Sequence, residues 1–235
     1  MGGTQGRRTG EGEHRLPPAV AVGAAGLLYA LLPSSLVVGP RYVVPAVEAA
    51  LLVALVVTNP VRLVRETRWS RWAAMALAVV MVVTNLVSLG LLVGEASRES
   101  TPGSSLLVAA LQVWATNVVG FALLYWELDR GGPVSRRERP RSQLPAADFR
   151  FSQDEDDDTV DEVSRGSSRH AGWVPVFVDY LYVSLTNSSA FSPTDTMPLT
   201  SRAKVLMGTE ASAALLTSLV VVARAVGGLA GGSGG

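Results

Sequence analysis

The chain contains no cysteine and only two histidines, and aromatic residues make up just 6% of it. Without cysteine it can form no disulfide, no thiolate metal site and no cysteine nucleophile. Both histidines, His14 and His170, lie in polar segments, so the apolar segments offer no His or Cys for a nucleophile–base pair. We therefore expect neither a metal centre nor a cofactor, and we do not expect an enzyme.

The chain also has no excess of positive or negative charge. The 20 Lys and Arg residues balance the 20 Asp and Glu residues, so the net charge gives no general attraction to nucleic acid. Lys204 is the only lysine, and every other basic residue is arginine. Together with the many Ala, Val and Gly residues, this bias is typical of a high-GC bacterial coding preference.

The chain does have long apolar runs. Residues 72–94 and 105–126 contain no charged residue, and each run exceeds 20 residues. A helix of that length crosses roughly 30 Å of hydrocarbon at about 1.5 Å per residue. Further apolar segments lie at 16–38, 43–59, 173–190 and 205–226. The sequence predicts an all-α fold, a polytopic helical membrane bundle of six apolar segments, of which the fifth is short and either crosses or re-enters.

Polar segments divide the chain into five expected regions. These are a disordered N-terminus (1–15), a four-span membrane region (16–127), a charged cytoplasmic linker (128–172), a channel-like membrane hairpin (173–226) and a flexible Gly-rich tail (227–235). The linker carries a cluster of arginines followed by a run of carboxylates. Such charge blocks bury little apolar surface, so we expect the linker to be disordered.

Arginine placement predicts the orientation in the membrane. Four arginines follow the second apolar segment, and five more begin the linker. Basic residues in short loops stay in the cytoplasm. Six crossings with both termini cytoplasmic satisfy this rule best, in the cell membrane (inner membrane) of a bacterium. If residues 173–190 re-enter instead, five crossings place the termini on opposite sides.

Polar residues inside the apolar segments are the candidate functional residues. A carboxyl group there costs on the order of 3 kcal/mol on insertion scales, so it needs a partner or a water-filled cavity. Glu210, Thr217 and Arg224 recur every seven residues and therefore share one helical face. The candidate polar path comprises Asp179, Thr186, Asn187, Asp195, Glu210 and Thr217. Two interpretations stay open: a path for an ion, proton or small solute, or interhelical hydrogen bonds that hold the bundle together.

A pattern in the C-terminal part of the chain resembles a known family. The residues that carry it are Asp179-Tyr180-Leu181-Tyr182, Ser184, Thr186, Phe191, Asp195 and Thr200-Ser201-Arg202, before a final apolar helix. This pattern is similar to that of the domain of unknown function 1345 family of bacterial integral membrane proteins. The resemblance covers residues 173–226, and it implies a multi-pass membrane protein with no established activity.

The same segment is similar in order to the pore region of two-span potassium channels, through Leu185-Thr186, Asp195 and Pro198. A potassium filter aligns backbone carbonyls with the help of glycines, and no glycine lies between Asp179 and Gly208. We therefore do not expect a potassium-selective pore. Two functions remain: conduction of an ion or small solute through the hairpin, or a structural or partner-binding role. The expected partners are the bilayer, a second copy of the chain and the conducted species, but not nucleic acid.

Overall fold

The computed structural model describes residues 12–58, 61–63, 67–98, 103–155, 161–189 and 196–231. Its longer helices are α1 (Leu16–Ala30), α2 (Val43–Thr58), α3 (Arg68–Ala96), α4 (Gly103–Leu128), α7 (Phe177–Ser188) and α8 (Ser201–Gly231). Shorter helices are α5 (Pro133–Glu138), α6 (Asp161–Ser164) and the 3-10 turns η1 (Ser34–Leu36), η2 (Asp129–Gly131), η3 (Arg141–Gln143) and η4 (Ser152–Asp154). Strand β1 (Glu13–His14) pairs antiparallel with β2 (Arg62–Leu63), and β3 (Phe149–Arg150) pairs antiparallel with β4 (Met197–Pro198). The described chain is therefore mostly helical.

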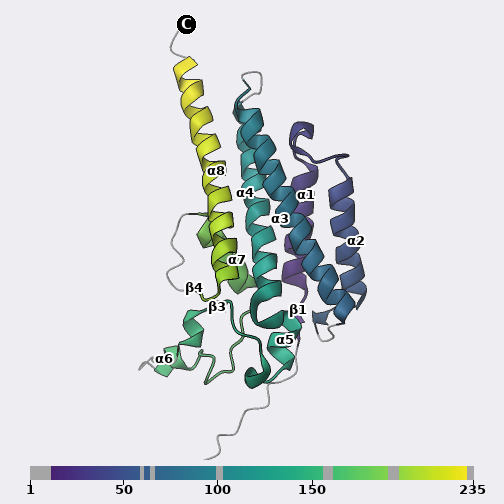
Figure 1. The fold of residues 1–235 in the computed structure, drawn as a ribbon, viewed down its shortest axis with the longest axis vertical. Coiled ribbons are helices and arrows are strands. Elements are labelled where there is room, and N and C mark those ends of the chain that lie inside the picture. Colours follow the sequence, from purple (N-terminus) through teal and green to yellow (C-terminus); the bar gives the residue numbers. More distant parts are fainter. Residues whose placement is uncertain are drawn as a thin grey trace, which may run out of the picture.

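Helix α4 lies at the centre of a bundle and contacts α1, α3, α7 and α8 (Figure 1). Gly120 lies where α4 packs against α3, and an added Cβ there would meet the Val82 side chain at 3.3 Å. A small residue at such a crossing lets two helix backbones come close together. We call the end of the bundle where α4 ends and α8 begins the linker end, and the end where α3 ends and α4 begins the far end.

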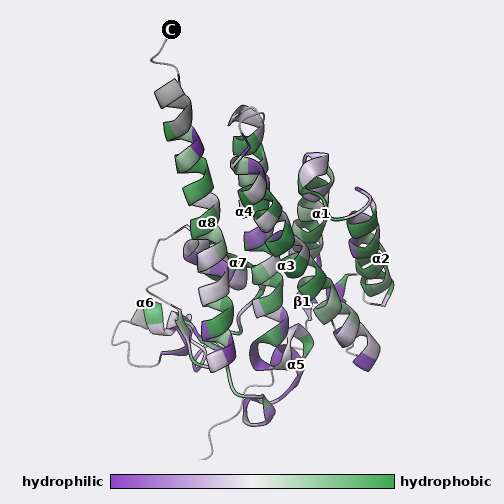
Figure 2. Cartoon of the chain, turned by 45° about the horizontal axis from the view of Figure 1, so that its top comes forward, coloured by the Kyte–Doolittle hydropathy of each residue, from purple (hydrophilic) through white to green (hydrophobic). Residues whose placement is uncertain are grey.

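Three helical segments among the described residues are long and apolar enough to cross a membrane: Arg68–Ala96, Gly103–Gly131 and Ser201–Val226. Large apolar side chains point outward from them, such as Val83 on α3 and Leu219 on α8, which are 52% and 53% exposed. In Figure 2 the bundle helices are largely hydrophobic, and polar residues gather at the linker end. These features are consistent with a membrane protein.

The six apolar segments are not confirmed as six crossings. Helices α1 and α2 are apolar but have only 15 and 16 residues. At about 1.5 Å per residue each is shorter than the roughly 30 Å of a hydrocarbon core. Helix α7 has 12 residues and is shorter still.

Helix α7 enters the bundle from the linker end and stops about halfway along α4. The hydroxyl of Tyr180, in its first turn, donates to Asp129 just beyond α4, and the carbonyl of Ser188 at its other end accepts from Trp114 in the middle of α4. Helix α8 begins at the linker end too, because β4 pairs there with β3. Helix α7 therefore does not run the whole length of the bundle. The described N- and C-terminal residues lie at opposite ends of the bundle (Figure 1).

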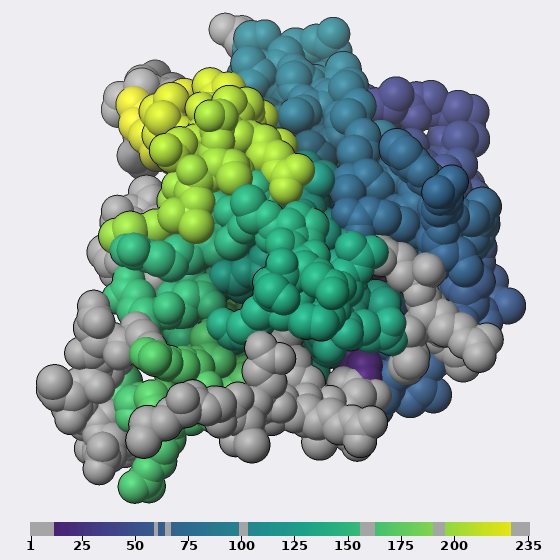
Figure 3. All heavy atoms as spheres, turned by 60° about the horizontal axis from the view of Figure 1, so that its bottom comes forward, coloured from purple at the N-terminus to yellow at the C-terminus, as the bar shows by residue number. Residues whose placement is uncertain are grey.

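The linker differs from the expected disordered segment. Phe149 and Phe151 are 1% and 4% exposed, and the Phe149 ring packs against Tyr125 with the two ring centroids 5.0 Å apart. The linker, coloured teal to green, covers much of the molecule's surface when it is seen from this end (Figure 3). Phe149 and Phe151, which lie between the two charge blocks, thus attach this part of the expected linker to the core.

Charge pairs hold the linker as well. Arg130 pairs with Asp154 within it, and Arg202 at the start of α8 pairs with Asp148. The Asp148 side chain is 1% exposed and also accepts from the Thr200 hydroxyl at 2.5 Å. Charges of opposite sign thus neutralise one another in the folded chain, which the separate blocks in the sequence do not indicate.

The two expected tails are described only in part. Of residues 1–15, only 12–15 lie within the described residues, and there Glu13 is 5% exposed in strand β1. Of residues 227–235, those up to Gly231 continue helix α8. The described residues therefore include part of each of these two segments.

Candidate functional site

A fully buried carboxyl group lies where α4, α7 and α8 meet. Glu210 on α8 is 0% exposed. Its Oε2 accepts hydrogen bonds from the Tyr125 hydroxyl at 2.6 Å and from the Asn187 side-chain amide at 2.7 Å. Its Oε1 accepts from the Ser188 hydroxyl at 3.1 Å and from the Ser184 hydroxyl. We call these five residues the Glu210 cluster.

The local sequence explains how α7 supplies three of the donors. Ser184, Asn187 and Ser188 are spaced by three and four residues, so a helix places them on one face. Asn187 also donates to the backbone carbonyl of Met207, one turn before Glu210 on α8. Helices α7 and α8 are therefore joined by side-chain hydrogen bonds to both backbone and carboxyl groups.

The electrostatic setting of Glu210 is unusual for a buried acid. All four of its hydrogen-bond donors are neutral, and no ion pair to it occurs in the part of the chain that the structure describes. An isolated ionised carboxylate in an apolar interior is very costly unless it is paired or well hydrogen-bonded. The cluster thus stabilises the charged form by hydrogen bonds alone, and it equally accommodates a protonated carboxyl because hydroxyl groups both donate and accept.

Buried amides extend the polar interior along α4 toward the far end. The Asn117 side-chain nitrogen is 3.5 Å from the Ser188 hydroxyl oxygen and from the Glu210 backbone oxygen. On α3, Asn85 donates to the Thr116 hydroxyl at 2.6 Å. The side-chain oxygens of Asn85, Gln112 and Asn117 have no hydrogen-bond partner among the described residues. Each can accept a hydrogen bond from a further donor.

The structure brings two of the six predicted path residues together, Asn187 and Glu210. Thr217 lies two turns further along α8, is 4% exposed and donates to the carbonyl of Ala213 on its own helix. It faces the bundle interior, as the spacing from Glu210 predicts, but its hydroxyl bonds to α8 itself. The face of α8 that carries Glu210 and Thr217 is therefore buried, as the sequence pattern predicts.

The other predicted path residues lie elsewhere. Asp179 is at the start of α7, where its carboxylate accepts from the Val176 backbone N–H at 2.7 Å and so caps the helix. Thr186 is half-buried and donates to the carbonyl of Tyr182 on its own helix at 2.9 Å. Asp195 lies outside the described residues.

Sequence reasoning missed Tyr125, Ser184 and Ser188. Tyr125 stands near the end of an apolar segment, where a tyrosine is ordinarily an interfacial anchor. The two serines share a helical face with Asn187, so the spacing in α7 could have revealed them. No sequence pattern indicates that Tyr125 on α4 bonds to Glu210, because the two residues are 85 positions apart in the sequence.

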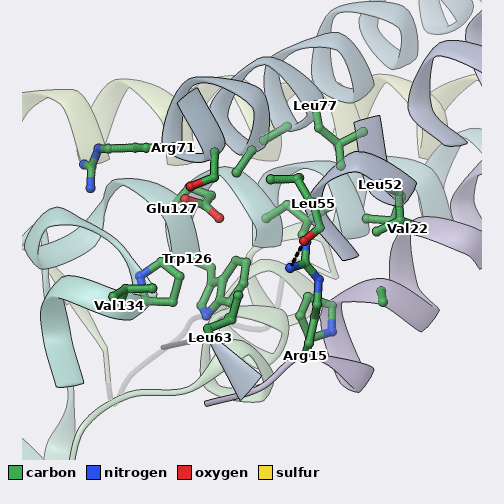
Figure 4. Close-up of a pocket in the computed structure, with 17 residues that line it drawn as sticks. Arg15, Val22, Leu52, Leu55, Leu63, Arg71, Leu77, Trp126, Glu127 and Val134 are labelled. Atoms are coloured by element: carbon green, nitrogen blue, oxygen red, sulfur yellow. Dashed lines mark hydrogen bonds between the residues drawn. The ribbon is translucent and has the colours of Figure 1, made fainter. Parts of the chain in front are cut away.

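A second site lies between α1, α2, α3 and α4 at the linker end (Figure 4). It is a mostly apolar cavity of about 60 Å³, with Arg15, Arg71 and Glu127 among its lining residues. Arg15 donates to the carbonyl of Leu55 across it. Because one water needs roughly 15 Å³ of such space, the cavity has room for only a few waters.

Comparison of the chain with protein-family models, with curated proteins and with solved structures found no match. The similarity of residues 173–226 to the domain of unknown function 1345 family stays a prediction. Among the described residues, no group of three or more His, Cys, Asp and Glu side chains could hold a metal ion. The site is therefore interpreted from the chemistry of its own residues.

Proposed function

We propose that the protein is a multi-pass membrane protein that conducts protons through the Glu210 cluster. The observation that carries the proposal is a completely buried carboxyl whose hydrogen-bond donors are all neutral. A glutamine could also accept hydrogen bonds from serine and asparagine, without the cost of burying an ionisable group. The presence of a glutamate at this position is best explained if its carboxyl group binds and releases a proton.

The short distances in the Glu210 cluster favour a proton as the conducted species. Tyr125, Asn187 and Ser188 donate to the carboxylate directly over 2.6 to 3.1 Å, which leaves no room for a hydrated ion between them. The hydroxyl groups of Tyr125, Ser184 and Ser188 can each give one proton and accept another. These properties favour a proton over the ion or small solute that the sequence left open.

Polar groups on both sides of the cluster support a route. Toward the linker end, one turn of α7 separates Ser184 from Tyr180, whose hydroxyl donates to Asp129 at 2.5 Å. Toward the far end, Asn117 and Gln112 lie on α4 with side-chain oxygens that can accept further hydrogen bonds. A proton that enters at Asp129 would pass Glu210 before it reaches these amides.

A structural role is the second candidate, and a separate observation favours it. The donors to Glu210 come from two different helices, so the carboxyl joins α8 to both α4 and α7. Interhelical hydrogen bonds in membrane proteins commonly contribute about 0.6 to 2 kcal/mol. In this case the protein is a structural or partner-binding membrane protein, and Glu210 needs no titration.

The arrangement in the membrane follows from charge. The linker end carries Arg62, Arg71 and the arginines of the linker, whereas the far end carries Arg41 and Arg98. The rule for basic residues then places the linker end in the cytoplasm of a bacterial cell. With α7 re-entrant, the chain crosses five times, its N-terminal side is cytoplasmic and α8 ends on the opposite side. The bilayer thins locally around the shorter helices α1 and α2.

Proton flux into proteoliposomes tests the proposal. A pH gradient is imposed on vesicles that contain the wild-type chain, the Glu210→Gln variant or the Ser212→Ala variant, and the internal pH is followed with a trapped dye. Ser212 is the matched control, because it is exposed on α8 and bonds only to Gly208 on its own helix. We expect Glu210→Gln to abolish flux with little change in thermal stability, and Ser212→Ala to conduct as the wild type does.

Two results separate the candidate functions. Flux through Glu210→Gln equal to that of the wild type removes Glu210 from any proton path. If Glu210→Ala in addition unfolds at a clearly lower temperature, the structural role is supported. Wild-type vesicles no more permeable than empty vesicles would also overturn proton conduction.

A further inference from the structure

A second buried carboxyl group lies in the bundle, on a helix that takes no part in the Glu210 cluster. Glu48 on α2 is 4% exposed, and its Oε2 has no hydrogen-bond partner among the described residues. It is the only charged residue in the four apolar segments before the linker, 16–38, 43–59, 72–94 and 105–126. An ion pair within these segments therefore cannot explain why Glu48 is buried.

The carboxyl group is buried because α2 packs closely against α1. Helix α2 lies at the edge of the bundle and packs mainly against α1 and α3 (Figure 1). A Cβ added to Gly26 on α1 would meet the Glu48 Oε2 at 3.3 Å. The carboxyl group therefore rests against the backbone of α1, at a position where glycine leaves the space for it.

The helices around Glu48 bring no charge to it. Neither the apolar segment of α1 (16–38) nor that of α3 (72–94) contains Asp, Glu, Lys, Arg or His. The one tyrosine in these two segments, Tyr29, accepts from the Val38 backbone N–H at 3.0 Å. Arg41, in the turn before α2, donates to the carbonyl of Leu32 at 3.0 Å. Nothing on the two packed helices thus offsets a negative charge at Glu48.

A helix surface offers acceptors to a neighbouring side chain, but not donors. Inside a helix each N–H is bonded to the carbonyl four residues before it, whereas each carbonyl oxygen keeps a second lone pair. The Thr84 hydroxyl on α3 uses such an oxygen, since it donates to the Val80 carbonyl at 2.6 Å. A carboxylate only accepts, so α1 gives it no partner, but a protonated carboxyl group can donate to a carbonyl. The neutral form also avoids the high cost of an unpaired charge in an apolar interior.

We propose that Glu48 is a second proton-binding site and that its proton keeps α2 packed against α1. Glu48 and Leu55 are the two buried side chains of α2. Release of the proton creates a carboxylate that needs water, so the carboxyl group must leave its contact with Gly26. Helix α2 then keeps only Leu55 as a buried side chain, and its packing against α1 weakens. Proton binding and the contact between the two helices are therefore coupled.

The place of Glu48 along α2 separates it from the Glu210 cluster. Glu48 is the sixth residue of α2, which starts at Val43 at the far end of the bundle. At about 1.5 Å per residue, the carboxyl-bearing residue is about 7.5 Å from that start and twice as far from the end of the helix. Its proton is therefore exchanged with the solution at the far end, independently of conduction through the Glu210 cluster.

Infrared spectroscopy of the purified full chain in phosphatidylcholine vesicles tests the proton at Glu48. A protonated carboxyl group has a C=O stretching band that is distinct from the bands of amides and carboxylates. Spectra of the wild type and of Glu48→Gln are recorded from mildly acidic to alkaline pH. Their difference contains the Glu48 band alone, so the result does not depend on whether Glu210 binds a proton. Glutamine has the shape of the neutral acid, which favours normal folding of the variant.

Glu95→Gln is the matched control. Glu95 lies near the end of α3, and its carboxylate pairs with Arg98 at 3.0 Å. We expect the wild-type band to be absent from Glu48→Gln and present in Glu95→Gln at mildly acidic pH. The same band should disappear from the wild type as the pH rises.

A distance measurement tests the coupling to helix packing. Because the chain has no cysteine, single cysteines at Leu27 on α1 and Val53 on α2 can carry two spin labels without background. Both positions are exposed, at 62% and 60%, so the labels should not disturb the packing. Raising the pH should lengthen the distance between the labels in the otherwise wild-type chain. It should leave the distance unchanged when Glu48→Gln is also present.

The proposal is overturned if the wild type and Glu48→Gln show the same protonated-carboxyl band, because Glu48 is then ionised inside the bundle. It is also overturned if the distance between the labels does not respond to pH. A response of equal size in the chain with Glu48→Gln would overturn it too, because another group then controls the packing of α2.

Discussion

The hydroxyl of Tyr180 donates a 2.5 Å hydrogen bond to the carboxylate of Asp129, and both residues are 0% exposed. The other carboxylate oxygen of Asp129 accepts from the backbone N–H groups of Asp148 at 2.7 Å and Phe149 at 3.4 Å. One buried side chain beyond α4 therefore holds both α7 and the linker. This contact explains why α7 starts at the linker end and why the linker folds there.

The Tyr180–Asp129 bond can be tested by removing the phenol oxygen. Tyr180→Phe is expected to lower the free energy of unfolding by about 1–3 kcal/mol, because a buried acceptor loses its donor. Tyr182→Phe is the matched control, since Tyr182 lies on the same helix and is 51% exposed. Unfolding in detergent measures both variants. Equal stabilities would show that the Tyr180 hydroxyl contributes nothing to the fold.

The packing of the linker predicts a large effect of a single aromatic residue. Phe149→Ala leaves a hole beside Tyr125 and Tyr180 and is expected to cost about 3–5 kcal/mol. Val163→Ala, at a linker position that is 53% exposed, should change stability by less than about 0.5 kcal/mol. Thermal unfolding compares the two. A disordered linker would make Phe149→Ala as harmless as Val163→Ala.

The proposed topology predicts which positions are labelled from outside intact cells. Because the native chain has no cysteine, single cysteines at Gly103, Ser142 and Gly231 can be compared without background. An impermeant thiol reagent should label Gly103→Cys and Gly231→Cys but not Ser142→Cys. Six crossings would instead protect Gly231→Cys, and labelling of Ser142→Cys would reverse the orientation.

Glu13 predicts a pH dependence of stability. Burial raises the pKa of this carboxyl above its ordinary value of 4.5, against the opposing effects of Arg136, the Phe177 N–H, the Trp126 indole and Arg137. The folded state then binds a proton more tightly than the unfolded state. The free energy of unfolding should therefore fall as the pH rises from about 4.5 through the raised pKa.

The variant Glu13→Gln isolates this effect. It has no proton to lose at this position, so its free energy of unfolding should decline less than that of the wild type over the same pH interval. Denaturant titrations at a series of pH values measure the difference. If the wild type gained stability relative to Glu13→Gln as the pH rose, the sign of the pKa shift would be wrong.

Part of the candidate site could be predicted from the sequence. Glu210 could be recognised as a candidate because it is an acidic residue in the last apolar segment. The seven-residue spacing placed Thr217 on the same interior face. The donor from α4 could not be predicted, because Tyr125 is 85 residues away and its role depends on how three helices pack. Asp179 was grouped with the path because of its charge, but it caps α7.

The sequence by itself determined that the chain is mostly helical and that it has helices long and apolar enough to cross a membrane. Long apolar runs such as 72–94 and 105–126 form helices that suit a bilayer, and this depends only on hydropathy and length within one segment. Only the tertiary structure decided that α7 stops partway along α4, that Phe149 and Phe151 of the linker are buried, and which donors surround Glu210. These features rest on contacts between distant residues, such as Asp148 with Arg202, which are 54 positions apart and meet only after the helices have packed.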